Sequence, residues 1–460
     1  MGRFITNLLS LGVDSAGEMN QMVHLRNESY GSMKVHARSR RNHMEFDLAI
    51  TGASLLVGAD FDVIVDGAVG IRDGRIAWLG RSSELGEHDP RQTIDAAHTA
   101  VLPSFVNAHT HLPMSRFRGL ADDVTLDEFI SRTTGAEQEE LTRARVEGAA
   151  RSAAIESILG GTTAALDMYP FDQEVALGAS SVGLAALTGP TYSRFASPDA
   201  RDFDQWLIES RRQLESLPLE RRLLAPHSAY GLSFEEMCLI GELAAELQAR
   251  IHVHASESDE EVAQVTQLHG ARPIEVLERA GLLGPRTVVA HAVSVNAAEI
   301  QRLADTGTSV AHCPWSNLKL GCGVAPVPAM LAAGVNVAIG TDGTVSSPAL
   351  DVWSAVRLVA NVHKGWSHDP QAVSAREALR MATVGGQRAI GRPDAGTLAV
   401  GAPAHLQAVR ITGPHLESSR NLLASLVYAG RPSDVRHVIA DGRIRVFDGE
   451  LVLEGERMEQ

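Results

Sequence analysis

The sequence contains few cysteines and no long apolar run. Only Cys238, Cys313 and Cys322 occur in 460 residues, and this odd, widely spaced set makes neither a disulfide framework nor a Cys-x-x-Cys zinc site. We therefore expect three reduced thiols in a cytoplasmic protein. Since a membrane-spanning helix needs about 18 consecutive apolar residues or more, and no such run exists, we expect no contact with a membrane.

Positive charge is also scarce. The chain has 41 Lys and Arg against 56 Asp and Glu, a formal net charge of -15. Nucleic-acid polymers are bound through dense cationic surfaces, so this balance argues against them and leaves a small molecule as the expected partner. The hydrophobic share of 44% is that of a soluble globular protein with a large buried core.

Residues 1–43 differ from the rest of the chain. They are locally basic and show no sustained periodicity, whereas a regular pattern starts just after Met44. Thr6 and Asn7 interrupt their first apolar stretch, and no clear cleavage site follows, so they match a signal peptide poorly. We expect a disordered extension or the product of an upstream start.

Strand patterns occupy both ends of the remaining chain. Residues 44–103 contain short strand-like runs separated by Asp66-Gly67 and Asp73-Gly74, dipeptides typical of hairpin turns. The same texture returns in residues 396–460, and the tetrapeptide Asp-Gly-Arg-Ile that begins at Asp73 recurs at Asp441. We therefore expect the two ends to build one small β-sandwich domain.

In residues 104–395 apolar strand-like runs alternate with helical stretches. Several of these helices begin with an N-cap oxygen followed three residues later by glutamate, at Thr125/Glu128, Ser233/Glu236, Ser258/Glu261, Asn296/Glu299 and Ser374/Glu377. The expected strands are 100–109, 162–167, 183–188, 222–227, 250–255, 287–291, 308–312 and 335–342. Eight strand-helix units in this length predict an α/β fold, a (β/α)₈ TIM barrel.

Histidine is the abundant residue, with 18 copies, and several copies end a predicted strand. Side chains at such positions are His109, His111, His227, His254, His291, His312 and Asp342. In a barrel the carboxyl ends of the strands form the catalytic rim. His109 and His111 leave the same face of their strand, and with a third histidine and an aspartate they describe a one-metal site suited to zinc.

These residues resemble the amidohydrolase superfamily. Within it, the chain is similar to the methylthioadenosine/S-adenosylhomocysteine deaminases, whose relatives include triazine chlorohydrolases and guanine deaminases. The resemblance covers about residues 46–452 and rests on several segments. They are Asn107-Ala-His-Thr-His, Gly160-Gly-Thr-Thr, Asp167-Met-Tyr, Ala225-Pro-His-Ser-Ala-Tyr, His252-Val-His-Ala-Ser-Glu, Val289-Ala-His-Ala-Val, Ser316-Asn-Leu-Lys-Leu and Ile339-Gly-Thr-Asp-Gly.

The resemblance implies a metal-dependent hydrolytic deaminase of an adenosine-type nucleoside, namely 5′-methylthioadenosine, S-adenosylhomocysteine or adenosine. The products would be the oxo (inosine-type) compound and ammonia. The implied cofactor is one divalent ion, Zn²⁺ with Fe²⁺ or Mn²⁺ as alternatives, and family members commonly form homo-oligomers. The implied metal ligands are His109, His111, His254 and Asp342. The implied catalytic residues are Glu257, His291 and Asp342, and the implied substrate-binding residues are Glu137, His227, Glu257 and Phe129.

The chain departs from the family pattern at two positions that bear on the substrate. Phe129 replaces a tryptophan, which keeps an aromatic face but loses the indole N–H. Thr188-Gly189-Pro190 replaces a Thr-Arg-Gly segment, so the arginine expected to hold the carboxylate of S-adenosylhomocysteine is missing there. Arg194 or Arg201 could replace it.

Other functions stay open from the residues alone. Glu257 disfavours a triazine chlorohydrolase, because chloride leaves without a proton, yet that enzyme and a guanine or pterin deaminase are the alternatives within the superfamily. A non-catalytic metal-binding barrel is the alternative from another class. Among the other side chains, His252 is expected behind the ligands, His312 in the core, and Ser316-Asn317 as loop-shaping residues.

Overall fold

The computed structural model describes residues 45–86, 90–195, 197–417 and 419–453. The expected disordered extension at 1–43 lies outside these residues. The described residues group as one compact unit. In the described ranges, no helix has the length and apolar character needed to cross a membrane.

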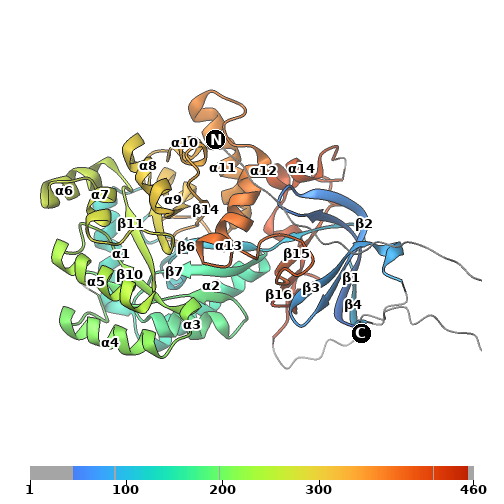
Figure 1. Ribbon diagram of the computed structural model, residues 1–460, viewed down its shortest axis with the longest axis horizontal. Helices are drawn as coiled ribbons and strands as arrows, with labels where there is room; N and C mark the ends of the chain where they lie inside the picture. Colours follow the sequence, from blue (N-terminus) through green and yellow to red (C-terminus); the bar gives the residue numbers. More distant parts are fainter. Residues whose placement is uncertain (1–44, 87–89, 196, 418, 454–460) are drawn as a thin grey trace, which may run out of the picture. The chain divides into compact units, whose positions relative to one another are not determined.

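Strands from both chain ends share one nine-stranded sheet (Figure 1). Its order is β18-β17-β16-β15-β5-β1-β2-β3, with β4 paired to β1. β5 joins the two ends, because it runs parallel to β1 and antiparallel to β15. The nine strands are β1 Phe46–Val57, β2 Asp62–Arg72, β3 Arg75–Arg81, β4 Pro90–Asp95, β5 Thr99–Pro103, β15 Leu406–Arg410, β16 Val435–Ala440, β17 Arg443–Phe447 and β18 Glu450–Leu451.

The repeated tetrapeptide forms two similar hairpin turns. Asp73 and Gly74 link β2 to β3, and Asp441 and Gly442 link β16 to β17. All four residues have positive φ, between 51° and 74°, as a type I′ turn requires. A Cβ on Gly442 would lie 2.7 Å from the Gly74 Cα, so the tips of the two hairpins touch.

The turn predicted at Asp66-Gly67 is wrong. β2 continues through both residues, and the register with β1 shifts on either side of the Ala53–Gly67 pair. Asp66 has a φ of 51°, which accommodates this irregularity as a bulge inside the strand. An Asp-Gly pair tolerates positive φ in either setting, so the dipeptide alone does not distinguish a bulge from a turn.

The parallel strands of the central region lie in two sheets, one of order β6-β7-β8 and one of order β14-β13-β12-β11-β10-β9. Their bounds are β6 Phe105–Thr110, β7 Thr162–Asp167, β8 Ala185–Leu187, β9 Thr191–Tyr192, β10 Leu223–Pro226, β11 Arg250–Ala255, β12 Thr287–His291, β13 Ser309–His312 and β14 Val337–Ile339. Each predicted strand is present in this region. The first is split, since β5 belongs to the nine-stranded sheet and only β6 belongs here, and β9 was not predicted.

Helices separate these strands and cover them (Figure 1). The longer ones are α1 Leu126–Glu140, α2 Arg143–Leu159, α3 Asp172–Ser180, α4 Phe203–Glu215, α5 Phe234–Leu247, α6 Asp259–His269, α8 Ala297–Thr306, α11 Val352–Ser367 and α14 Leu422–Ala429. The shorter ones are α7 Pro273–Arg279, α9 Pro314–Lys319, α10 Val327–Ala332, α12 Ala375–Arg380 and α13 Gly386–Ala389. Each predicted N-cap side chain accepts a hydrogen bond from the predicted glutamate's N–H.

Small apolar side chains fill the space between the parallel strands. Val106 and Ala108 on β6 pack in one buried cluster with Ala164 on β7, Ala311 on β13 and Ala338 on β14. The two parallel sheets also meet directly, because the Asp342 N–H donates to the His109 carbonyl over 3.0 Å. This contact brings the carboxyl ends of β6 and β14 together, where the site lies.

Candidate active site

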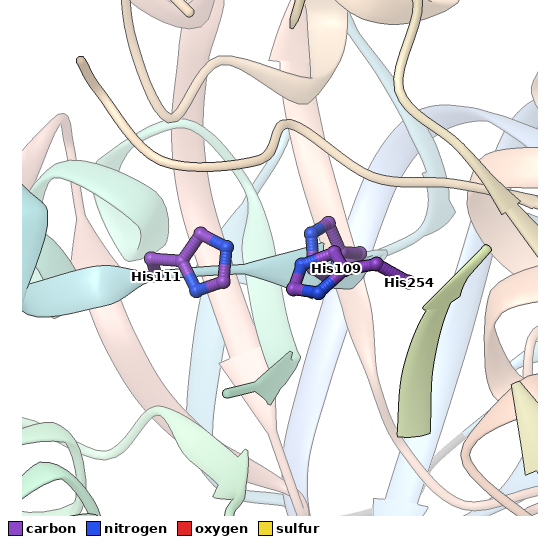
Figure 2. Close-up of side chains that lie close together, drawn as sticks. All are labelled: His109, His111 and His254. Carbon is purple, nitrogen blue, oxygen red and sulfur yellow. The ribbon is translucent and has the colours of Figure 1, made fainter. Parts of the chain in front are cut away.

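Histidines from separate strands converge at the carboxyl ends of the parallel sheets. His109 lies in β6, His111 directly follows it, and His254 lies in β11. Figure 2 shows these three side chains in one small volume, although β6 and β11 are far apart in the sequence. His291 ends β12, and its ring centroid lies 5.3 Å from that of His109. The predicted clustering is therefore present.

The spacing of the side-chain atoms suits one metal ion. Asp342 Oδ1 lies 3.3 Å from His109 Nε2 and 3.2 Å from His111 Nε2. Two ligand atoms that are each about 2.1 Å from a tetrahedral zinc ion lie about 3.4 Å apart. His254 offers a third nitrogen within 4.8 Å of those of His109 and His111. Three imidazoles and a carboxylate are ligands that zinc accepts.

The other ring nitrogen of each histidine that could bind a metal lies against a neighbouring group. His111 Nδ1 donates to the Met168 carbonyl at 2.5 Å, and His254 Nδ1 donates to the His227 carbonyl at 2.8 Å. Since a carbonyl only accepts, each bond leaves the Nε2 lone pair of a neutral ring for the site. His109 Nδ1 lies 2.9 Å from His252 Nε2, and its own Nε2 is buried without a hydrogen bond.

Burial and mutual proximity set the charges of these candidate ligands. Burial lowers the pKa of His109 to about 4 and that of His254 well below its ordinary value. Burial opposes ionisation of Asp342, but His109 and His111 beside it outweigh that effect and hold its pKa well below normal. At His111 burial also acts downward, yet the Asp342 carboxylate raises its pKa to about 9. A bound cation would take the place of that proton.

Glu257 and His291 face one another beside these candidate ligands. Glu257 Oε1 lies 3.8 Å from His291 Nε2. Burial raises the pKa of Glu257. Burial alone would lower the pKa of His291, but Glu257 and Asp342 outweigh it and raise that pKa. His291 Nδ1 donates to Asn317 Oδ1 at 2.9 Å, which fixes the ring so that Nε2 faces Glu257.

The backbone is strained where the site residues leave their strands. Asp342 and His291 have φ of 64° and 72°, and Ser256, one residue before Glu257, has φ of 55°. Residues other than glycine rarely adopt such angles, and functional sites are where they gather. Gly340 allows the close approach of β14 to β6, since a Cβ there would lie 2.9 Å from the His109 Cβ.

A pocket opens over these residues. His111, His254, His291, Glu257 and Asp342 line its floor. Its walls carry aromatic, hydroxyl and acidic side chains, namely Phe129, Tyr169, Phe195, Tyr230, Thr133, Thr134, Thr191, Ser193, Ser197, Ser346, His227 and Glu137. The structure thus brings every predicted site residue except the fully buried His109 to the surface of one pocket, with His109 directly behind it.

Two of the predicted substrate-binding residues have defined neighbours. Tyr169 Oη donates to Glu137 Oε1 at 2.6 Å, and burial raises the pKa of that carboxyl group. His227 Nδ1 lies 3.0 Å from Ser228 Oγ, and burial lowers the pKa of His227 to about 3. Its ring is therefore neutral at pH 7 and packs edge-on against Phe195, with centroids 5.4 Å apart.

Comparison with known proteins agrees with this geometry. The sequence profile of the Amidohydrolase family matches residues 100–445, about three quarters of the chain. The chain belongs to the amidohydrolase family. The match spans every side chain of the pocket described above.

Several relatives of this amidohydrolase carry functional names. The 5-methylthioadenosine/S-adenosylhomocysteine deaminase of Syntrophobacter fumaroxidans is 38% identical over 410 residues, which cover 88% of this chain and 94% of the relative. The 5′-deoxyadenosine deaminase of Methanothermobacter thermautotrophicus is 37% identical, with the same coverage. A crystal structure of an adenosine deaminase from Xanthomonas campestris, with bound zinc, has 32% identity, a TM-score of 0.84 and coverage of 89% and 94%.

Sequence reasoning missed some partners within the amidohydrolase site. Ser316-Asn317 was expected only to shape a loop, but Asn317 accepts the hydrogen bond from His291. Ser346 Oγ donates to Asp342 Oδ2 at 2.7 Å, and no motif drew attention to it. Tyr169 lines the pocket and is the hydrogen-bond partner of Glu137. His312 is buried beside His363, as expected of a core residue.

Proposed function

We propose that this amidohydrolase is a metal-dependent deaminase of adenosine-type nucleosides, which it converts to the inosine-type product and ammonia. The observation that carries the proposal is the placement of Glu257 and His291 beside three histidines and an aspartate on the floor of one pocket. Relatives named as deaminases of 5-methylthioadenosine/S-adenosylhomocysteine, 5′-deoxyadenosine and adenosine support the substrate class.

The metal site of this proposal consists of His109, His111, His254 and Asp342. One divalent ion fits these ligands, zinc first and Fe²⁺ or Mn²⁺ as alternatives. When bound, such an ion supplies a water molecule whose pKa is lowered from about 15.7 towards 7, and hence a nucleophile at neutral pH. The zinc bound to the adenosine deaminase from Xanthomonas campestris supports this choice.

Glu257 is the proposed proton donor to the ring nitrogen of the substrate. An ordinary glutamic acid has a pKa of about 4.3 and is ionised at neutral pH. Burial raises the pKa of Glu257, which keeps a proton available nearer to the pH at which the enzyme works. Asp342 is the proposed acceptor of the proton that the attacking water releases, and it would pass this proton to the amino group, which leaves as ammonia. Glu257 would regain its proton from the new hydroxyl group as that becomes the oxo group.

His291 is the proposed orienting group for the oxygen that attacks the ring carbon. Its hydrogen bond to Asn317 fixes the imidazole with Nε2 towards the floor of the pocket. A preorganised donor of this kind stabilises charge that develops on oxygen in the transition state. The raised pKa of His291 favours the ring form with a proton on Nε2.

Glu137, His227 and Phe129 are the proposed substrate-binding residues. One oxygen of Glu137 accepts from Tyr169, and we propose that the other accepts from a hydroxyl group of the sugar. Phe129 offers an aromatic face to a purine ring. The neutral ring of His227 can donate or accept one hydrogen bond.

The test of the function is a substrate panel assayed for ammonia release and ultraviolet shift with the metal-loaded enzyme. The panel holds adenosine, 5′-deoxyadenosine, 5′-methylthioadenosine, S-adenosylhomocysteine, guanine, pterins and chlorinated triazines. We expect turnover of adenosine-type nucleosides. Turnover of guanine, pterins or triazines alone would favour the other superfamily chemistries, and no turnover of any aminated ring would remove the deaminase proposal and leave a non-catalytic metal-binding barrel.

We also propose the finer architecture and assembly. The two parallel sheets would be arcs of one (β/α)₈ barrel in residues 104–395, supported by the Asp342–His109 backbone bond and by the bond from the Ala225 N–H to the Pro190 carbonyl. Residues 44–103 and 396–460 would form a β-sandwich around the nine-stranded sheet. A homo-oligomer is proposed from the family resemblance, and light scattering on the purified protein tests it.

A further inference from the structure

The walls of the pocket carry carboxyl groups without cations. Glu137, Glu257 and Asp342 all line it, whereas no Lys or Arg does so in the part of the chain that the structure describes. Apart from His111, His254 and His291 at the proposed metal site, the other polar groups of the pocket are hydroxyls and the neutral ring of His227. A negatively charged substituent of a bound substrate that lies against the pocket wall, away from the proposed metal site, would therefore meet no lysine or arginine.

Arg194 is one of the two arginines that could replace the one missing from Thr188-Gly189-Pro190. Its neighbours Ser193 and Phe195 line the pocket, but Arg194 itself does not. Its Nε donates to both oxygens of Glu236, at 2.9 and 3.2 Å. Glu236 in turn closes the capping box of α5. In the structure the guanidinium therefore pairs with Glu236 and does not enter the pocket.

Arg201 is held in a similar way. Its Nη1 pairs with the Glu209 carboxylate on α4, and its Nε donates to the Asp199 carbonyl at 3.4 Å. It does not line the pocket. Both arginines that could have replaced the missing one in Thr188-Gly189-Pro190 are thus engaged by acidic residues of their own.

We propose that the pocket accepts adenosines whose 5′ substituent carries no carboxylate and discriminates against the homocysteine adduct. This inference rests on the proposed deaminase function. The hydroxyls of Thr191, Ser193 and Ser197 can meet a 5′-hydroxyl or a thioether, and Phe195 offers apolar contact to a methyl group. None of them compensates a buried anion, and an uncompensated buried charge is strongly disfavoured.

The ammonium group of the homocysteine tail does not remove this penalty. It is attached to the same carbon as the carboxylate, so a pose that brings the ammonium to Glu137 also brings the carboxylate into the pocket beside it. At such a short distance the carboxylate of the tail and that of Glu137 repel one another. Salt screens this repulsion little, because the two charges are not exposed to solvent.

The experiment compares kcat/KM for S-adenosylhomocysteine with that for 5′-butylthioadenosine, which has a tail of similar length and no charge. Adenosine and 5′-deoxyadenosine are included as reference substrates. We expect the butylthio compound to exceed the homocysteine adduct at least about tenfold, since an unpaired charge in a binding site is rejected by this much or more. A ratio below ten overturns the inference. If neither reference substrate reacts, the proposed function itself fails.

A variant tests whether charge is the cause. Thr134 lies on α1 and lines the pocket, whereas Gln138 on the same helix is exposed and does not. Thr134→Arg and Gln138→Arg add the same charge. We expect Thr134→Arg to lower the ratio at least threefold and Gln138→Arg to leave it unchanged. An equal ratio in both variants, with adenosine still turned over, contradicts the electrostatic cause.

Discussion

Each histidine on the floor of the pocket is oriented by a group behind it. Met168 and His227 offer carbonyls, Asn317 an amide oxygen, and His252 a ring nitrogen. Fixed rings lose little conformational entropy when a ligand binds, and the position of the ring proton is set in advance. At the residue scale, the reactivity of the site therefore depends on the groups that orient these rings, two of which are backbone carbonyls, as well as on the rings themselves.

The first prediction concerns Glu257. Glu257→Gln keeps the size and polarity of the side chain but removes the acidic proton. We expect kcat for adenosine to fall about 100-fold or more, as for loss of a general acid, while the metal content per chain stays the same by elemental analysis. The matched control is Glu260→Gln, an exposed residue on α6. Near-normal deamination by Glu257→Gln would remove its assigned role.

The second prediction concerns His252, whose Nε2 lies against His109 Nδ1. His109 can present a lone pair at Nε2 only if its Nδ1–H donates to His252, so His252 must act as the acceptor. Loss of this acceptor makes the unproductive tautomer of His109 available. We expect His252→Phe to weaken zinc binding about 10- to 100-fold, measured by competition with a chromophoric chelator.

The control for His252 is His363→Phe. His363 is also a buried histidine with an unpaired ring nitrogen, but it lies on α11 away from the pocket. General damage from replacing a buried histidine would affect both variants equally. Zinc affinity that is lowered in neither variant would show that His252 does not position His109.

At the scale of elements, the turn between β11 and α6 contains both the N-cap of the helix and the proposed catalytic residue Glu257. Ser258 caps α6 by accepting the N–H of Glu261. The sequence predicts a reciprocal capping box, in which Glu261 would accept the N–H of Ser258. Instead, Glu261 Oε2 accepts the N–H of Glu257 at 2.5 Å. The same carboxylate therefore holds the backbone of the proposed catalytic residue.

The third prediction is the pH dependence that Glu261 causes. Burial is the main cause that raises its pKa from 4.5 to about 7, although the backbone N–H of Glu257 opposes this. Between these pH values the folded protein holds a proton that the unfolded chain releases, so this group lowers the free energy of unfolding as the pH rises. Above about pH 7 the loss is complete.

Glu261→Gln keeps an acceptor for the Glu257 N–H but does not titrate. We expect the free energy of unfolding of the variant minus that of the parent protein to increase by about 1 to 3 kcal/mol from pH 5 to pH 8. Urea unfolding at each pH measures this difference. Glu260→Gln, at the exposed neighbouring position, should leave the pH dependence as it is. Parallel curves for Glu261→Gln and the parent protein would contradict the assignment.

The strands were predictable because burial leaves a direct trace in the sequence. β7, β11 and β12 are runs of buried residues with the predicted bounds. β9 has only two residues, Thr191 and Tyr192, too few to show a period. The partnership of Asn317 with His291 joins residues from α9 and β12, and local pattern contains no information on such tertiary contacts.

At the scale of the whole molecule, the N-terminal and C-terminal strands contact each other through two hairpin turns, β2–β3 and β16–β17. The repeated Asp-Gly-Arg-Ile segments predict the same local structure, and both do form hairpin turns with φ of 51° at the aspartate. What the repeat did not predict is that the two tips touch, with Gly442 and Gly74 in close approach. Contact between segments 368 positions apart follows from the pairing of β5 with both β1 and β15.

The last prediction tests this contact with two glycines that differ in one respect. Gly442 and Gly449 both have positive φ, 74° and 87°, and both lie in hairpin turns of the C-terminal strands. A Cβ on Gly442 would lie 2.7 Å from Gly74 Cα, whereas one on Gly449 would lie no closer than 3.5 Å to any neighbour outside its own turn. Because an alanine is strained at positive φ, replacement of either glycine should lower the free energy of unfolding by about 1 kcal/mol.

Only Gly442→Ala should add the cost of separating the two hairpins, about 1 to 3 kcal/mol more. We expect its midpoint of urea unfolding to fall clearly below that of Gly449→Ala. Both variants should keep their metal content and their kcat for adenosine, since neither position lines the pocket. Equal destabilisation would mean that backbone strain alone accounts for the loss, and that contact between the hairpins contributes nothing to joining the chain ends.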